Sequence, residues 1–286
     1  MSDSSRAVLC IDAGNTLVKW CTQPDWKAGF LLNGPVSSFS SQGLKGQSDN
    51  WPQFERLLRH DLLFPGLSAV LLCSVLGIGL EEKMRVLCST LGLPLHILSV
   101  RAYQPVNSAY INPASLGRDR WAATLAVSNE SRHPVNLLVS FGTATTLDAL
   151  VDQAGWQHLG GYIVPGVQTM FSSLHVNTAE LPRVDLDSAS LSVHRVIGSQ
   201  ALALPQPAWP ESTTRAISEG VVNMQVAMVQ ACAQRLEQQF GQKACIWLTG
   251  GFASLVLPRL SEARILEHAV FRGQLLDYQL HREQAA

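Results

Sequence analysis

Short apolar runs and longer segments with helical spacing follow one another along most of the chain. The short runs predict strands at 69–75, 95–100, 136–140, 145–151, 156–163 and 244–248. The helical spacing predicts helices at 50–63, 81–91, 113–130, from 167 onward, and at 213–240. Residues 182–212 are rich in Pro, Ser and Asp, so we expect a loop excursion with short helices there. Alternation of this kind is typical of the α/β class.

Two segments at the starts of the two halves share one pattern. VLCIDAGNTLVK begins at Val8 and NLLVSFGTATTLD begins at Asn136, with Gly14 and Gly142 as equivalent residues 128 positions apart. Each segment reads as a buried strand, a small polar turn at the glycine and a second strand, which predicts a β-hairpin. A chance match of two apolar hairpins is the alternative. We favour duplication because each copy opens a segment of ordinary domain length.

Length and charge limit the classes of protein to consider. At 286 residues the chain exceeds the usual size of a single core, and 47% hydrophobic residues are enough for two lobes. We expect the boundary at His133-Pro134, which gives domains 1–133 and 134–286. A net charge of −1 without basic clusters argues against broad binding to nucleic acid or anionic lipid.

The same composition favours a cytoplasmic protein. The six cysteines form no C-x-x-C pair and read as small buried hydrophobic residues in a reducing compartment. The apolar stretch before Asp12 is too short for a signal peptide. Residues 62–80 carry no charge, but Pro65 and three glycines divide them into loop, strand and loop, so we do not expect a membrane span.

The first hairpin tip carries Asp12, Asn15, Thr16 and Lys19 around Gly14. Amides near a glycine can approach phosphate oxygens, a lysine supplies charge, and an aspartate can hold Mg²⁺ directly or through water. An ordinary hairpin, in which Asn and Asp merely favour the turn, explains the residues equally well. The segment matches neither the Walker A loop nor the dinucleotide-binding fingerprint.

The second tip and a later turn offer related chemistry. Ser140, Gly142 and Thr143, with Thr145 and Thr146, could bind phosphate, although threonine is also a common strand residue. Gly250 and Gly251 follow a strand and would let the backbone pass close to adenosine; a plain strand-to-helix turn fits nearly as well. Zinc-binding and serine-hydrolase motifs are absent from the sequence.

The segment from Asn112 to Arg120 is the richest in chemical groups. Pro113 can start a helix and Gly117 clears space in its first turns. Asp119 could then accept a proton from a substrate hydroxyl, and Arg120 could bind a carboxylate or phosphate. A solvated helix face with an internal ion pair is the plainer alternative.

Together these segments resemble the type III pantothenate kinases, which include the Bvg accessory factor homologues. The resemblance covers nearly the whole chain in order, in seven motifs: IDAGNTLVK from Ile11, YxNPxxLGRDR from Tyr110, SFGTATT from Ser140, GGYIVPG from Gly160, TAELP from Thr178, Ile197-Gly198, and TGG from Thr249. The fold it implies is two ribonuclease-H-like or actin-like lobes of the acetate and sugar kinase–Hsp70–actin superfamily. The reaction it implies is ATP-dependent phosphorylation of pantothenate to 4'-phosphopantothenate, the first step of coenzyme A biosynthesis.

The resemblance also implies roles for individual residues. It places ATP phosphates and Mg²⁺ at the first hairpin, with Asp12, Gly14, Asn15, Thr16 and Lys19, and ATP at Gly142 and Thr143 of the second. It places pantothenate at Tyr110, Gly117, Arg118, Asp119 and Arg120, with Asp119 as general base. Gly160, Gly161, Pro165 and Gly166 match a glycine-rich turn lining the cleft, and Thr178 matches a threonine near pantothenate in the partner subunit. The family implies a homodimer with sites at the interface and a monovalent cation such as K⁺ or NH₄⁺.

One residue departs from the family pattern. Ser140 stands where the commonest form of the second motif has an aspartate that helps to bind the monovalent cation. A neutral hydroxyl is a weaker cation ligand than a carboxylate. The alternative function is therefore a non-catalytic, nucleotide-binding regulatory homologue, which Ser140 and the accessory-factor name suggest. We favour the enzyme because Asp12, Lys19 and Asp119 are all retained.

Overall fold

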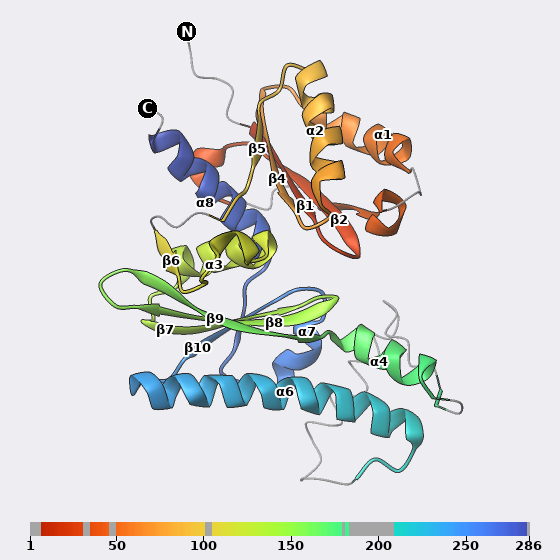
Figure 1. Cartoon of the computed structure of the whole chain (residues 1–286), viewed down its shortest axis with the longest axis vertical. Helices are drawn as coiled ribbons and strands as arrows, with labels where there is room; N and C mark the ends of the chain where they lie inside the picture. Colours follow the sequence, from red (N-terminus) through yellow and green to blue (C-terminus); the bar gives the residue numbers. More distant parts are fainter. Residues whose placement is uncertain are drawn as a thin grey trace. The chain divides into compact units, whose positions relative to one another are not determined.

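The structure, a computed structural model, describes residues 7–30, 35–45, 50–100, 105–178, 181–182 and 209–284. The chain divides into two compact units (Figure 1): residues 1–130 with 268–286, and residues 131–267. The first boundary lies close to the expected one at His133-Pro134. The C-terminal residues 268–286, which we expected in the second lobe, belong to the first unit because α8 (Ala269–Gln284) packs on its sheet.

The first unit contains a five-stranded sheet in the order β3-β2-β1-β4-β5. Its strands are β1 (Ala7–Ala13), β2 (Leu17–Gln23), β3 (Ser37–Ser40), β4 (Leu67–Ser74) and β5 (Leu95–Ile97). β1 and β2 form an antiparallel hairpin extended by β3, whereas β4 and β5 run parallel to β1. The first of the two predicted hairpins is therefore present.

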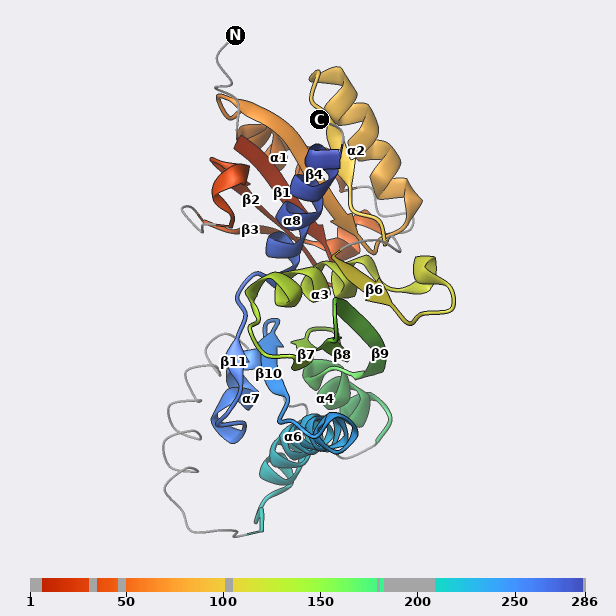
Figure 2. The same cartoon turned by 90° about the vertical axis from the view of Figure 1, so that its left-hand side faces the viewer.

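Both faces of this sheet are covered, because alternate residues of β1 point to opposite sides. On one face Leu9 and Ile11 pack against α1 (Trp51–Leu62) and α2 (Ile78–Thr90). On the other face Val8 and Cys10 pack against α8, which crosses the sheet in Figure 2. Helix α8 also packs against α3 (Arg118–Glu130). The remaining elements of this unit are η1 (Trp26–Ala28), η2 (Ser41–Leu44), β6 (Val106–Ser108) and η3 (Pro113–Ser115).

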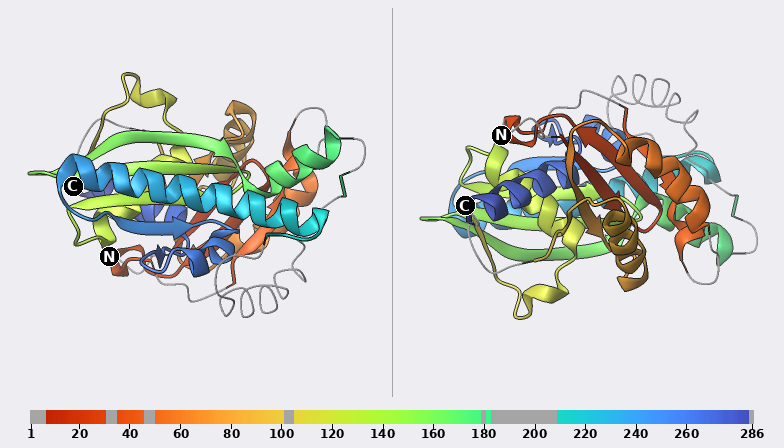
Figure 3. Two further views of the ribbon diagram at one scale, coloured as in Figure 1. Left: turned by 90° about the horizontal axis from the view of Figure 1, so that it is seen from below. Right: turned by 90° about the horizontal axis from the view of Figure 1, so that it is seen from above.

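Within the second unit the strands follow the order β11-β10-β7-β8-β9. They are β7 (Val135–Phe141), β8 (Ala144–Asp152), β9 (Trp156–Pro165), β10 (Cys245–Thr249) and β11 (Arg264–Ile265). The helices are α4 (Val167–Val176), α6 (Thr213–Phe240), α7 (Ala253–Val256) and η4 (Leu257–Arg259). The long helix α6 runs along one face of this sheet (Figure 3) and buries Val222, Val226 and Val229 against it.

The two sheets share one topology. In each, an antiparallel hairpin is extended by a third antiparallel strand on one side and by two parallel strands on the other. Gly14 and Gly142 occupy equivalent places, since each follows the first strand of its hairpin and each N–H closes the tip on a backbone carbonyl at 3.1 Å. The internal echo in the sequence thus corresponds to a repeat in the fold.

Most predicted elements are present, with one helix in a different form. The helix expected at 113–130 is split into η3 and α3, because Leu116 is extended between them. Asn112 caps η3 by accepting a hydrogen bond from Ala114 N at 3.1 Å, so the first turn forms separately. Strands β3, β6 and β11 and helix α8 were not predicted. Of the expected loop excursion, residues 183–208 lie outside the described residues.

All six cysteines are buried and free, as expected for small hydrophobic residues. Among the described residues, no helix combines the length and apolar composition needed to span a bilayer.

Candidate active site

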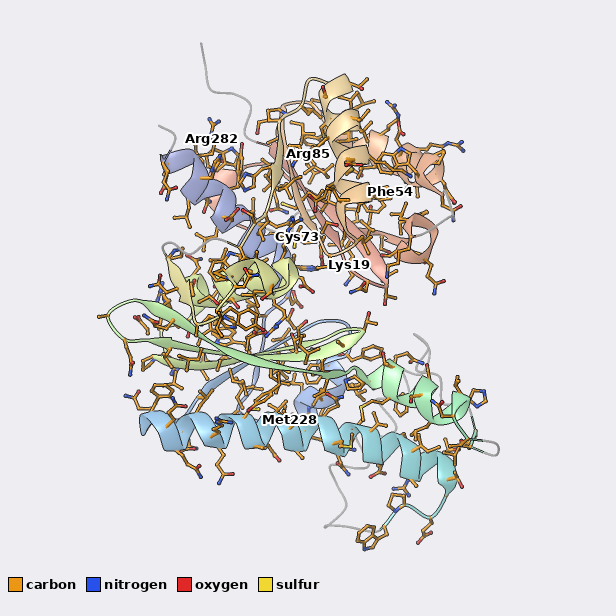
Figure 4. All side chains as sticks on the ribbon, in the orientation of Figure 1. Lys19, Phe54, Cys73, Arg85, Met228 and Arg282 are labelled. Carbon is orange, nitrogen blue, oxygen red and sulfur yellow. The ribbon has the colours of Figure 1, made fainter. Side chains whose placement is uncertain are left out.

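Asp12 lies near the end of β1, beside the first hairpin tip. It is directly opposite Lys19 on β2 and opposite Cys73 on the parallel strand β4. Residues opposite each other in neighbouring strands share a face of the sheet, so these three side chains lie on the face that also carries Cys10. Figure 4 labels Cys73 and Lys19 on this part of the sheet.

The pKa of Asp12 is raised from its ordinary 3.8 to about 7. Burial is the largest cause, because it removes water from the charged form of the carboxyl group. Lys19 lowers this pKa and Asp119 raises it, so both charges act directly on Asp12. The fold therefore brings together two carboxylates that are far apart in the sequence.

Asp119 is held in the first turn of α3. Its Oδ1 accepts a hydrogen bond from Arg120 N at 2.9 Å. A Cβ placed on Gly117 would lie 2.7 Å from the same oxygen, so a larger residue at position 117 would displace the carboxylate. Gly117 O also accepts the bond from Trp121 N at 2.9 Å. The glycine thus begins the helix and leaves room for its acidic side chain.

The two arginines beside Asp119 are each bound to another part of the first unit. Arg118 Nη1 forms an ion pair with Glu81 Oε1 of α2. Arg120, with 6% of its surface exposed, donates from Nη1 to Tyr110 Oη at 2.7 Å, and its guanidinium carbon lies 5.6 Å from the centroid of the Tyr110 ring. The fold thus brings together Tyr110 and Arg120, two of the residues that the resemblance places at pantothenate. Glu81 was not predicted, since nothing in its local sequence distinguishes it.

The hairpin tip itself is in contact with η2. Ser41 and Lys45 donate hydrogen bonds to Gly14, Asn15 and Thr16. Asn15 and Thr16 are exposed, and Ser41 is fully buried. Sequence reasoning did not find Ser41 or Lys45, because their approach depends on the pairing of β3 with β2.

In the second unit, three hydroxyl groups take the places that Asp12, Lys19 and Cys73 occupy in the first. Ser140 is opposite Thr146 on β8 and opposite Thr249 on the parallel strand β10. These side chains share a face of the sheet and offer only neutral oxygens. Thr145 points to the other face, where its buried Oγ1 has no protein partner among the described residues.

Glycines allow close backbone contacts around the second hairpin tip. A Cβ on Gly166 would collide with the carbonyl oxygen of Gly142, and Gly166 N donates to Thr143 O at 3.1 Å. A Cβ on Gly250 would collide with the Phe141 carbonyl, and Gly250 has a φ of +92°, which side-chain-bearing residues rarely adopt. These contacts keep the tip and the following turns compact.

The remaining motifs of the resemblance lie on β9, after α4, and outside the described residues. Gly160 and Gly161 lie within strand β9 and do not form a turn. The pairing of β9 with β8 shifts register at this point, between Ala149 and Leu150 of β8. Gly160 has a φ of +102° at this bulge. Thr178 Oγ1 donates to Leu174 O at 2.7 Å. Ile197-Gly198 lies outside the described residues.

Asp12 and Asp119 are too few to form a complete metal site of protein side chains. Among the residues with described positions, no group of three or more His, Cys, Asp or Glu side chains is arranged to hold a metal ion. Asp12 and Asp119 are two carboxylates near a lysine and a glycine turn. That set can share a hydrated cation with a phosphate and orient a hydroxyl group, which is the chemistry of phosphoryl transfer.

Comparison with known families identifies the family to which the chain belongs. The family profile for type III pantothenate kinase matches residues 8–235. The chain belongs to the type III pantothenate kinase family. It is therefore an enzyme of a kinase family, as the resemblance implied.

Individual members of the family align over nearly their whole length. A type III pantothenate kinase of Janthinobacterium sp. (strain Marseille) is 32% identical over 267 residues, covering 89% of this chain and 90% of the relative. That of Herminiimonas arsenicoxydans is 31% identical over 264 residues, covering 90% and 91%.

Solved structures confirm the expected fold. A 2-dehydro-3-deoxygalactonokinase-type protein from Sinorhizobium meliloti gives a TM-score of 0.56 at 15% identity, covering 96% of each chain. A conserved Baf family protein from Campylobacter jejuni gives 0.53 at 17% identity, covering 97% of this chain and all of the other. These likenesses show that the chain shares the fold of both proteins, two α/β units as the resemblance led us to expect.

Proposed function

We propose that this protein transfers the γ-phosphoryl group of ATP to the primary hydroxyl of pantothenate, giving ADP and 4'-phosphopantothenate, the first step of coenzyme A biosynthesis. Family membership supports both substrates. The observation that carries the proposal is the interaction between Asp12 and Asp119. The charge of Asp119 raises the pKa of Asp12, so the fold brings the two carboxyl groups into electrostatic contact. One carboxylate lies beside a glycine turn suited to phosphate, and the other begins a helix suited to the acceptor.

Asp119 acts as the general base in this proposal. Its position is fixed by Arg120 N and by the space at Gly117, so it can orient the acceptor hydroxyl for in-line attack and accept its proton. Phosphoryl transfer depends on positioning and charge neutralisation more than on covalent chemistry. A positioned carboxylate is therefore sufficient.

Asp12 fits a role in holding Mg²⁺, directly or through water. Its carboxyl is partly buried and repelled by a second carboxylate, and this unfavourable arrangement is relieved by a cation. When bound, Mg²⁺ would neutralise charge on the phosphate oxygens. Gly14, Asn15, Thr16 and Lys19 bind the phosphates from the hairpin tip.

In the second unit the proposed nucleotide-binding residues lie at two glycine-containing turns. Gly142 and Thr143 bind ATP through the tip of the β7-β8 hairpin, whose compact form is supported by the contact with Gly166. Gly250 and Gly251 bind adenosine at the turn that follows β10. The positive φ of Gly250 and its lack of a Cβ keep this turn close to Phe141, and glycine backbone can also lie close to a ligand.

Pantothenate is bound by residues that the first unit already holds in place. Arg118 is oriented by Glu81, and Arg120 by Tyr110, so little side-chain freedom is lost on binding. Gly117 provides space. Gly161 on β9 and Thr178 after α4 are further proposed contacts, with Thr178 acting from the partner subunit of a homodimer.

The proposed monovalent-cation site in the second unit has no carboxylate among its facing side chains. Ser140, Thr146 and Thr249 offer neutral oxygens to K⁺ or NH₄⁺, a donor set that binds cations less strongly than a carboxylate.

An assay of ADP release with ATP, Mg²⁺ and pantothenate, run in potassium and then in sodium, tests the proposal. ADP release that requires pantothenate is expected. ADP release without pantothenate would contradict it. A melting temperature raised by ATP, with no ADP release in either salt, would instead support the non-catalytic nucleotide-binding homologue.

A further inference from the structure

Each backbone carbonyl of the first hairpin tip accepts a hydrogen bond from the segment that follows β3. Ser41 Oγ donates to Gly14 O at 2.6 Å, and Ser41 N donates to Thr16 O at 2.9 Å. Lys45 Nζ donates to Asn15 O at 2.6 Å and to Asn15 Oδ1 at 3.1 Å. The tip is thus fixed from one side by two residues outside the hairpin.

The path of the chain explains why these two residues reach the tip. β3 pairs with β2 so that Ser40 lies opposite Leu17, which brings Ser41 alongside the turn. The following 3-10 turn is held by Asn50, whose N donates to Gly43 O at 3.0 Å. A Cβ on Gly43 would collide with the Asn50 side chain, so this segment is closely packed. Ser41 and Lys45 are therefore held in place before any ligand binds.

Fixing the carbonyl groups also orients the amide groups. In a trans peptide the N–H of one residue points away from the C=O of the residue before it. With the carbonyls of Gly14, Asn15 and Thr16 turned toward η2, the N–H groups that follow them point to the opposite side. Carbonyl oxygens repel phosphate and N–H groups attract it, so this orientation favours an anion there.

We propose that Ser41 and Lys45 are positioning residues of the nucleotide site, an inference that rests on the proposed function. They fix the tip in its phosphate-binding conformation before ATP binds, which reduces the ordering cost of binding. Lys45 also adds a positive charge at the tip, beside that of Lys19. Neither residue needs to touch the reacting atoms.

Lys45 offers the cleaner test, because it is exposed and its replacement leaves the core unchanged. Lys45→Met should weaken Mg·ATP binding roughly tenfold, the usual effect of losing a hydrogen bond from a charged group. The KM for ATP should rise in parallel, with kcat and the KM for pantothenate near wild type. Binding of adenosine, which lacks phosphate, should not change. Lys45→Arg should restore most of the ATP affinity.

Two further variants support the comparison. Lys27→Met removes an exposed lysine of the same unit and should leave all these values at wild type. Ser41→Ala removes one bond to the tip and should also raise the KM for ATP, provided that its melting temperature shows a folded protein.

The outcomes separate this inference from the proposed function. Wild-type ATP affinity in Lys45→Met would overturn the inference alone, as would equal losses of ATP and adenosine affinity, which would indicate general damage to the fold. A wild-type protein that binds no Mg·ATP would overturn the proposed function and the inference with it.

Discussion

Ser140 occupies in the second unit the position that Asp12 occupies in the first. Each lies two residues before the glycine of a hairpin tip, Gly142 or Gly14, and each is paired on both sides, with the hairpin partner and with a parallel strand. The same backbone therefore presents a carboxylate in one unit and a hydroxyl in the other. The two hairpins have become specialised through side chains, without a change in topology.

Ser140→Asp should strengthen the dependence of activity on potassium. A carboxylate at this position would add charge to a set of neutral hydroxyl oxygens and so bind a monovalent cation more tightly. The measurement is the ratio of kcat/KM in potassium to that in sodium, which should be larger in the variant than in the wild type. Ser172→Asp, at an exposed position of α4, is the control for added charge. A flat response to potassium in both Ser140 forms would remove this cation pocket from the proposal.

The raised pKa of Asp12 predicts a pH dependence of stability in the ligand-free protein. The native carboxyl holds its proton up to about pH 7, whereas the unfolded one loses it near 3.8. The contribution of Asp12 to stability is therefore complete below pH 3.8 and declines as pH rises through about 7. Urea unfolding of wild type and Asp12→Asn, compared between pH 5 and 8, should show a steeper loss with rising pH in the wild type. If the free energies of unfolding of the two proteins changed with pH in parallel, the pKa of Asp12 would not be raised in the native protein.

Gly273→Ala should destabilise the first unit. A Cβ at this position would collide with the Ala122 carbonyl, so α8 and α3 could not keep their present approach. Overpacking of this kind costs about 1–3 kcal/mol, which urea unfolding would resolve. Gly220→Ala on α6 is the matched control, because a Cβ there meets nothing within 4 Å. We expect that control to be neutral or slightly stabilising, since alanine favours helices more than glycine does.

Local sequence signals predicted the elements but not their tertiary partners. The glycine turns and apolar runs were sufficient for both hairpins and for α6, whose patterns lie within one continuous segment. Helix α8 was missed, although Phe271, Leu275 and Tyr278 have helical spacing, and nothing local shows that it returns to the first sheet. Its docking depends on contacts with strands more than 190 residues earlier in the chain, such as the bond from Gln274 Nε2 to Leu71 O with a sequence separation of 203.

The same limit applies to the candidate site. Asp12 and Asp119 were each selected from a local motif, but their mutual effect on pKa arises only when α3 packs against the sheet near β4. Lys45 and Glu81 carry no motif at all. Their contacts come from the pairing of β3 and from the approach of α2 to α3, neither of which local spacing encodes.

Asp119→Asn tests the general base and its effect on Asp12 in one variant. The amide is close in shape to the carboxylate but cannot accept the proton of the hydroxyl, so turnover should fall by roughly 10²–10⁴. Loss of the negative charge should also lower the pKa of Asp12, because Asp119 raises it in the wild type. Mg·ATP affinity measured at pH 6.5 should therefore be equal to or tighter than that of the wild type, while turnover collapses.

This divergence between binding and turnover is the informative result. Glu82→Gln, which removes an exposed carboxylate from α2, should change neither quantity and controls for net charge. Unchanged turnover in Asp119→Asn would exclude Asp119 as the base. A parallel loss of ATP affinity and turnover would show instead that Asp119 supports the nucleotide site, and the acceptor's base would have to be sought among other groups near Asp12.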